Sequence, residues 1–420
     1  MSQRFTARLA TGLFFPQRLK LQIDGRSYSP CTLENLVLCG AHIPSYELGA
    51  QLLEQLTDIR VSGRHLQNLT SMIGQELADE RDIAVAAYAN QPLPRRPTPP
   101  TTPIGLACIS VDGGRMQTRL DSAGPGVHSP HWRETKNALF MRMTGVCFAT
   151  DPHPELPRCY ADKTRMKSLL SGLEQEVATD NKDFESSDKW RPEKLFRTTV
   201  SSLSDSQTFG QMMAAEADCR GFYCAEKQAF VCDGLPYNWT IQERHFSSFT
   251  PILDFVHAVE HAYAAARAST EENNQAWDLF RNWAAALWQG RVDQVVAQLQ
   301  DCQQSLGLPD PHAEDNDPRK IVADTIRYFQ NNASRMNYPK YRKDGLPTTS
   351  AHMESLVKEV NYRVKGSEKF WNDGPNGVAI LQVRAATLCD DDRLSNHMKR
   401  RPGNPFRPNV KITPMLALAG

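Results

Sequence analysis

AFVCDGLPYNW (residues 229–239) places a carboxylate at the point where an apolar run ends. The run AFVC is typical of a buried strand, and Asp233-Gly234 followed by Leu-Pro is typical of a turn. A second run, IGLACISV (residues 104–111), meets Asp112-Gly113-Gly114 in the same way. We expect both strands to end at their aspartates. If the strands are neighbours in one mixed sheet, the two carboxylates converge.

A third carboxylate, Glu354, begins the helix predicted for MESLVKEVNYRVK (residues 353–365). Three converging carboxylates repel each other and are costly without a cation. Two Mg²⁺ ions about 3.5–4 Å apart would relieve the repulsion and polarise a phosphodiester. Each Asp-Gly pair alone is also explained as an ordinary turn. The residues by themselves leave both interpretations open.

The totals of the chain limit the function classes. A chain of 420 residues is expected to form two or three domains. Lys plus Arg equals Asp plus Glu at 48 each, so any nucleic-acid surface must be a local patch. No stretch reaches the roughly 18 apolar residues of a membrane span. Cys219 and Cys224 lack a second pair for a zinc site, which favours reduced thiols in a cytosolic protein.

The chain before residue 90 has a helical pattern. YELGAQLLEQLTDI (residues 46–59) predicts one helix, and a second one, capped by Ser62, opens at Arg64-His65. This pair is compatible with a helix-turn-helix that reads DNA, but plain helical packing is the favoured interpretation. The next segment, NQPLPRRPTPPTTP (residues 90–103), holds six prolines and predicts an extended linker.

Further elements follow from the periodicity. RMQTRL (residues 115–120) and ETKNALFMRMTGVCF (residues 134–148) predict strands, and FTPILDF (residues 249–255) predicts a short third buried strand. Residues 166–218 have a polar, helical pattern, and residues 256–338 are helical almost throughout.

Three ordered strings resemble a known family: SVDGGRMQTR…HWRETK, FVCDGLPYNWTIQERHF…ILDFVHAVEHAY and YPKYRKDGLPTTSAHMESLVKEVNYRVKGSEKFW. They are similar to bacterial insertion-sequence transposases of the Kra type, which are DDE enzymes with an RNase H-like core and are related in pattern to Mutator-like elements. The resemblance covers about residues 12–388. It implies cleavage of DNA at the transposon ends and transfer of the freed 3′-OH into target DNA.

The resemblance also implies residue roles. Asp112, Asp233 and Glu354 would be the catalytic triad that holds two Mg²⁺ ions, for which Mn²⁺ can substitute. Asp254 and His257 resemble a D-x-x-H motif beside the site. His257 alone, on an apolar helix, is explained equally well as a core residue.

Basic and aromatic residues near the motifs are candidates for DNA contacts. Lys358, Arg363 and Lys365 follow Glu354 and could hold DNA phosphates, or could form a solvated helix face. Arg64 would contact DNA if the N-terminal helices read it. Trp239 and Trp371 could stack on a base, but core packing is the favoured interpretation.

We therefore predict an α/β protein with an RNase H-like mixed sheet flanked by helices, interrupted by an all-helical insertion and preceded by a helix-turn-helix-like domain. The predicted divisions are a helical N-terminal domain (1–89), a Pro-rich linker (90–104), the first part of the core (105–255), the insertion (256–345), the final part of the core (346–390) and a basic tail (391–420).

The expected partner is DNA, as transposon terminal inverted repeats and as target. We expect no membrane association, a homo-oligomer, as the resemblance implies, and a cytoplasmic location at the bacterial nucleoid. Two alternatives are left open. One is a DNA-binding protein that represses the element's ends without catalysis. The other is a nuclease that cleaves without joining.

Overall fold

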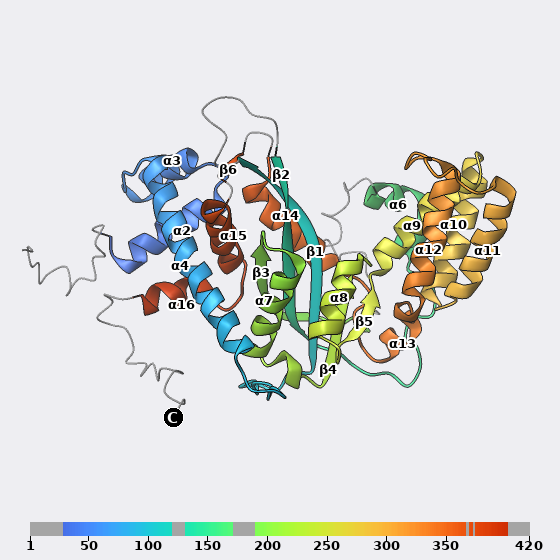
Figure 1. Ribbon diagram of the computed structural model, residues 1–420, viewed down its shortest axis with the longest axis horizontal. Helices are drawn as coiled ribbons and strands as arrows, with labels where there is room; N and C mark the ends of the chain where they lie inside the picture. The colour runs from blue at the N-terminus through green and yellow to red at the C-terminus, as the bar shows by residue number, and fades with distance from the viewer. Residues whose placement is uncertain (1–27, 120–130, 171–189, 367–368, 373, 402–420) are drawn as a thin grey trace, which may run out of the picture. The chain divides into compact units, whose positions relative to one another are not determined.

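The computed structural model describes residues 28–119, 131–170, 190–366, 369–372 and 374–401. Within them the strands form a mixed sheet (Figure 1). Its strands lie in the order β3 (Lys194–Ser202), β2 (His131–Met143), β1 (Leu106–Arg119), β4 (Lys227–Cys232) and β5 (Thr250–Leu253), and β6 (Trp371–Asn372) also pairs with β1. β1, β4 and β5 are parallel, whereas β3 is antiparallel to β2. The predicted α/β class is confirmed.

Two sequence-based expectations about the strands are wrong. β1 does not end at Asp112 but continues through two glycines to Arg119. Its far end pairs with β6, and Gly114 suits the interior of the strand because a Cβ there would lie 2.6 Å from the Thr135 hydroxyl. β3 lies where a helical pattern was expected. Its run of Thr and Val pairs with β2, and this tertiary pairing outweighs the local polarity.

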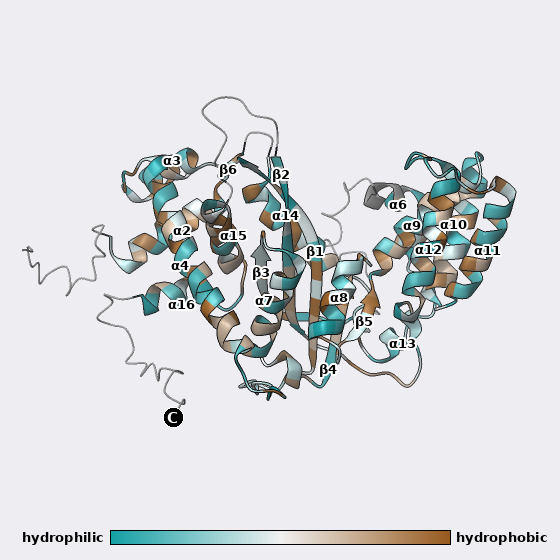
Figure 2. Ribbon diagram, viewed as in Figure 1, coloured by the Kyte–Doolittle hydropathy of each residue, from teal (hydrophilic) through white to brown (hydrophobic). Residues whose placement is uncertain are grey.

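Helices lie between the strands along the chain, and most of the chain from β5 to residue 364 is helical. Those between the strands are α5 (Arg158–Ala161), α6 (Lys163–Leu170), α7 (Ser206–Cys219) and α8 (Pro236–His245), with a 3₁₀ turn, η3 (Phe222–Cys224). After β5 come α9 (Phe255–Ser269), α10 (Asn273–Trp288), α11 (Val292–Leu306), α12 (Pro318–Asn332), η4 (Ala333–Arg335), α13 (Tyr338–Lys343) and α14 (Ala351–Val364). The helical pattern predicted for residues 256–338 is confirmed. α10, α11 and α12 each carry polar and apolar stretches, as amphipathic helices do (Figure 2).

The chain folds into two compact units. The first comprises Met1–Arg81, Met116–Trp132 and Tyr362–Gly420, and the second comprises Asp82–Arg115 and Arg133–Asn361. The first unit contains α2 (Pro30–His42), α3 (Tyr46–Thr57), most of α4 (Gly63–Ala89), α15 (Pro375–Thr387) and α16 (Arg393–Arg400). The domain boundaries predicted from sequence follow the order of the motifs along the chain, whereas these units combine segments that are far apart in the sequence. The predicted boundaries therefore stay a prediction.

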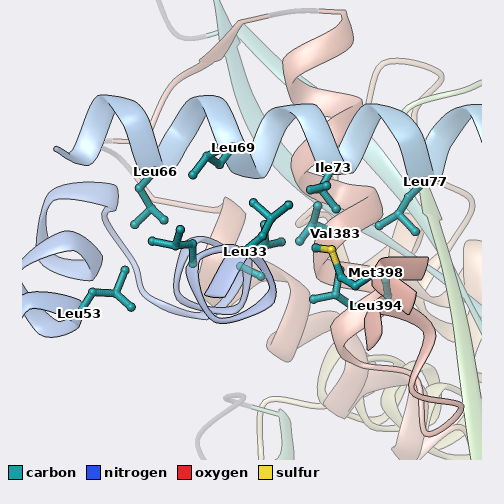
Figure 3. Packing of buried hydrophobic residues seen from close by; sticks show 13 residues of the cluster. Leu33, Leu53, Leu66, Leu69, Ile73, Leu77, Val383, Leu394 and Met398 are labelled. Carbon is teal, nitrogen blue, oxygen red and sulfur yellow. The ribbon is translucent and has the colours of Figure 1, made fainter. Parts of the chain in front are cut away.

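The core of the first unit is formed by helices from both ends of the chain. Leu66, Leu69 and Ile73 of α4 pack with Leu33 of α2 and Val383 of α15 (Figure 3). These residues are almost fully buried. The predicted helices are confirmed, including the cap at Ser62, whose hydroxyl accepts a hydrogen bond from the His65 amide at 3.2 Å. A helix-turn-helix role of α3 and α4 stays a prediction.

Charged groups fix α16 to α4. His397 is 3% exposed, with Nε2 2.9 Å from Glu76 and Nδ1 3.0 Å from Glu80. Arg401 also donates to Glu76, at 2.7 Å, and Arg400 lies 3.8 Å from Glu80. Burial lowers the pKa of His397, but the hydrogen bonds to the two glutamates outweigh it and raise that pKa. Burial opposes ionisation of Glu76, yet His397 and Arg401 lower the pKa of Glu76 to about 2.

We expect His397→Gln to destabilise the protein most between about pH 4.5 and 6.5. Because the pKa of His397 is higher in the folded than in the unfolded state, protonated His397 stabilises the fold fully at pH values below its unfolded-state pKa. This stabilisation is lost as pH rises through the folded-state pKa. The lowered pKa of Glu76 makes its contribution complete above its unfolded value and lost as pH falls towards about 2. Urea unfolding should show a difference of about 1–2 kcal/mol near pH 5.5 that shrinks by pH 9. A difference independent of pH would contradict this.

Candidate active site

Three aspartates lie in one row across three parallel strands: Asp112 lies within β1, and Asp233 and Asp254 directly follow β4 and β5. The register places the preceding residues opposite each other: Val111 of β1, Cys232 of β4 and Leu253 of β5. The aspartates are the next residue of each chain: Asp112, Asp233 and Asp254. Adjacent strands are about 4.8 Å apart, and residues at the same register step point to the same face. The fold therefore brings three carboxylates together at one level of the sheet.

Asp112 is coupled to its neighbour in the row. Its Oδ1 accepts a hydrogen bond from the Gly113 amide at 2.6 Å. Burial, and after it the negative charge of Asp233, raises the pKa of Asp112 to about 6. The charge of Asp254 also contributes to this shift. The neighbouring carboxylates therefore disfavour the ionised form of Asp112.

Asp233 is both a turn residue and a member of the row. Its Oδ1 accepts hydrogen bonds from the Leu235 amide at 3.1 Å and from the Asn238 side chain at 2.9 Å. These bonds connect the end of β4 to the start of α8. Gly234 has φ of +91°, and a Cβ there would lie 2.9 Å from Leu253 and from Tyr328. Glycine is therefore required directly after the aspartate.

Glu354 lies in the first turn of α14 and is coupled to the same acids. Burial, and after it the charge of Asp254, raises the pKa of Glu354 to about 7, and the charge of Asp112 adds to the effect. A carboxylate that follows Asp233 by more than a hundred residues therefore shares the electrostatic environment of the row.

Asp254 connects the row to the helix that carries Glu354. It is fully buried, and its Oδ1 accepts a hydrogen bond from the Val256 amide at 2.8 Å, which caps α9. Its Oδ2 accepts hydrogen bonds from the amide of Ser350, at 3.0 Å, and from the hydroxyl of Ser350. The Ser350 carbonyl in turn accepts a hydrogen bond from the Glu354 amide at 3.2 Å. Asp254 thus sets the position of the start of α14.

His257 supplies positive charge among these acids. Burial lowers its pKa, but the hydrogen bond to Glu260, 2.9 Å from Nδ1, and the charge of Asp254 outweigh burial and raise the pKa of His257 to about 10. Ligand atoms of Asp254, His257 and Glu354 all lie within 4.8 Å of one another. The structure therefore groups Glu354 most closely with the D-x-x-H pair, and Asp112 and Asp233 do not belong to this group.

The donor set is suited to a hard divalent cation. Mg²⁺ prefers oxygen ligands, and Mn²⁺ accepts both carboxylate and imidazole. Burial and the neighbouring carboxylates raise the pKa values of Asp112 and Glu354, and a bound cation would favour the ionised forms of both groups. All ten cysteines are free, and among the described residues none forms a metal-binding group.

A second polar cluster lies beside Asp112. Glu134 of β2 accepts a hydrogen bond from Lys136 at 2.8 Å and one from the Tyr237 hydroxyl at 3.4 Å. Lys136 also lies 5.6 Å from the centre of the Tyr237 ring. Burial raises the pKa of Tyr237, and the charges of Glu134, Asp233 and Asp112 raise it further. The cluster therefore borders the row.

The four residues predicted to contact DNA differ in their exposure to solvent. Arg64, Lys358 and Lys365 are exposed. Arg363 is 1% exposed and donates hydrogen bonds to the carbonyls of Gly40, at 2.8 Å, and Pro44, at 3.4 Å. A guanidinium buried in this way is not exposed to a phosphate, so the structure favours a structural role for Arg363 over the predicted DNA contact.

The two tryptophans pack in the core, as the favoured interpretation predicted. Trp239 is 6% exposed and donates a hydrogen bond to Asn332 at 2.9 Å. Trp371 is 7% exposed and donates to the Val364 carbonyl at 2.8 Å.

Sequence reasoning missed three residues that hold the acids: Asn238, Tyr328 and Ser350. A signal existed for Ser350, because TTSAHMESL has a Ser directly before a helical pattern and thus predicts an N-cap. Leu-Pro after Asp233 similarly marks the helix start that presents Asn238. No local pattern marks Tyr328, whose contact depends on the tertiary fold.

No protein-family model matches the chain, and no curated protein sequence is similar to it at a significant level. None of the described helices is long and apolar enough to cross a membrane. The geometry of the acid row is therefore the main evidence for function.

Proposed function

We propose that this chain is a DDE-type DNA transposase that cuts DNA at the ends of a mobile element and joins the freed 3′-OH to target DNA. The observation that carries the proposal is the row of Asp112, Asp233 and Asp254 on adjacent parallel strands, together with the electrostatic coupling of Glu354 to that row. Carboxylates that converge in this way, with Asp254 buried and Asp112, Asp233 and Glu354 half-buried, are costly unless they bind a cation.

The order of the strands supports an RNase H-like core. β1 lies between β2 and β4, the β1–β4–β5 part is parallel, and β3 is antiparallel to β2. In such a sheet the acids of the first and fourth strands are neighbours, although more than a hundred residues separate them. We propose that α9 to α13 are a helical insertion in this core, because they separate β5 from the helix that carries Glu354.

The acids have distinct proposed roles. Asp112, Asp233 and Glu354 would hold the divalent ions, which supply Lewis-acid activation of the phosphodiester and of the attacking oxygen when bound. Asp254 has hydrogen bonds on both oxygens and holds the start of α14, so its main task is to position Glu354. His257 balances part of the negative charge.

DNA binding is assigned to exposed basic groups near these elements. Lys358 lies one turn after Glu354 on α14, and Lys365 follows the end of the same helix. Such contacts hold the phosphate backbone without reading bases. We propose that α3 and α4, with Arg64 in the first turn of α4, form the helix-turn-helix-like part that contacts terminal-repeat DNA.

The test combines three assays on the full chain. Gel shifts use DNA of the inverted repeats that flank the reading frame, nicking is measured with Mg²⁺ or Mn²⁺, and joining is measured with pre-cut ends. Binding, metal-dependent nicking and joining together support the proposal. Binding without nicking would instead support a repressor, and nicking without joining would support a nuclease.

A further inference from the structure

Three tyrosines from the helical segment donate hydrogen bonds to main-chain carbonyls near the acid row. Tyr328 of α12 donates to Asp233 at 2.7 Å. Tyr338 and Tyr341 of α13 donate to Leu253 at 3.1 Å and to Pro251 at 3.3 Å. Pro251 and Leu253 lie in β5, and Asp233 directly follows β4.

The carbonyls of β5 need hydrogen-bond donors because β5 lies at the edge of the sheet. Among the described strands, β5 is the last in its direction, so one side of it has no strand partner. Carbonyls two residues apart, such as those of Pro251 and Leu253, point the same way along a strand edge. Buried carbonyls without donors are unfavourable, and the tyrosine hydroxyls take the place of the missing strand.

Tyr328 is held firmly on the turn that contains Asp233. Its ring stacks on His261, with the ring centres 3.8 Å apart, and Gly234 leaves no room for a side chain between the turn and the ring. Burial and the charge of Asp233 raise the pKa of Tyr328, so its hydroxyl keeps the proton that it donates.

A second bond joins α12 to the helix after the turn. Asn332 is 3% exposed and accepts a hydrogen bond from Trp239 of α8 at 2.9 Å. Its own amide donates to the Tyr328 carbonyl at 2.9 Å. The turn between β4 and α8 is therefore bonded to α12 both at its start and at α8.

We propose that Tyr328 is a positioning residue for Asp233, through which α12 fixes the turn that presents this carboxylate. The inference rests on the function proposed above, because Asp233 is a metal ligand there. The Asp233 carboxylate is oriented in two ways: Tyr328 holds the Asp233 main chain, and the Asn238 side chain donates a hydrogen bond to the carboxylate itself. Groups that orient metal ligands in this way affect metal affinity without touching the metal.

The experiment compares Tyr328→Phe with Tyr341→Phe in the full chain. Each variant loses one hydroxyl that donates to a main-chain carbonyl, but the Tyr341 acceptor, Pro251, lies three residues before Asp254 and away from Asp233. We expect Tyr328→Phe to weaken Mn²⁺ binding, measured by calorimetry, about 10-fold. Tyr341→Phe should leave the affinity unchanged. A merely stabilising role would make the two variants alike in metal affinity.

Amide hydrogen exchange in the metal-free protein tests the same inference without the metal. Tyr328→Phe should speed exchange in peptides covering residues 233–238, and Tyr341→Phe should not. Equal exchange and equal Mn²⁺ affinity in the two variants would overturn the inference. A wild-type chain that binds no Mn²⁺ would overturn the proposed function, and the exchange data would then decide whether Tyr328 holds the turn.

Discussion

Asp112→Asn should abolish DNA cleavage and at the same time make the protein more stable at neutral pH. Burial and the charge of Asp233 raise the pKa of Asp112 to about 6, so its ionised form is unfavourable in the folded state. The neutral amide removes that repulsion and still offers an oxygen to the Gly113 amide. We expect a gain on the order of 1–3 kcal/mol at pH 7. The substitution also removes a charged metal ligand, so the rate of DNA cleavage should fall on the order of 10⁴-fold or more.

The measurements are metal-dependent nicking and urea unfolding of the same preparations. Asp233→Asn and Glu354→Gln should lose cleavage to a similar extent while DNA binding is kept. Asp301→Asn is the matched control, because Asp301 is an exposed aspartate of α11, away from the acid row, and should change neither quantity. Wild-type cleavage by Asp112→Asn would remove Asp112 from the mechanism. Lower stability of this variant would show that the acids are not in mutual repulsion.

The acid row was predictable from sequence in part because its signals are local. Apolar runs that end at Asp112 and Asp233 mark buried strands, and the run before Asp254 marks β5. Parallel strands in register bring the residues after such runs together. What a local pattern does not contain is the pairing itself. The far end of β1, beyond Asp112, pairs with β6, and β3 pairs with β2.

The roles within the site were harder to predict than its members. Asp254 was expected only near the site, and its bonds to Ser350 join residues almost a hundred positions apart. From the sequence, Arg363 and Lys358 are equally good candidates for DNA contacts, since both are basic residues on the helix that carries Glu354. Only the packing of α14 makes one buried and the other exposed. Periodicity predicts a face of a helix but not which neighbour covers it.

Arg363→Met should unfold the protein more easily and should not act through a lost DNA contact. The guanidinium donates hydrogen bonds to the carbonyls of Gly40 and Pro44, and lies 4.6 Å from the Tyr46 ring centre and 5.0 Å from that of Trp371. Methionine keeps much of the length but leaves two carbonyls without their donor. We expect a loss of about 2–4 kcal/mol in the free energy of unfolding, measured in urea.

Lys358→Gln and Lys365→Gln provide the contrast, because both side chains are exposed. The double variant should unfold like the wild type and bind DNA more weakly. Each lost phosphate contact should reduce the slope of log affinity against log salt by about 0.9. Arg363→Met, measured where it is still folded, should keep the wild-type slope. If this variant were as stable as the wild type and lost the slope instead, Arg363 would be a phosphate contact and the burial seen here would not hold when DNA binds.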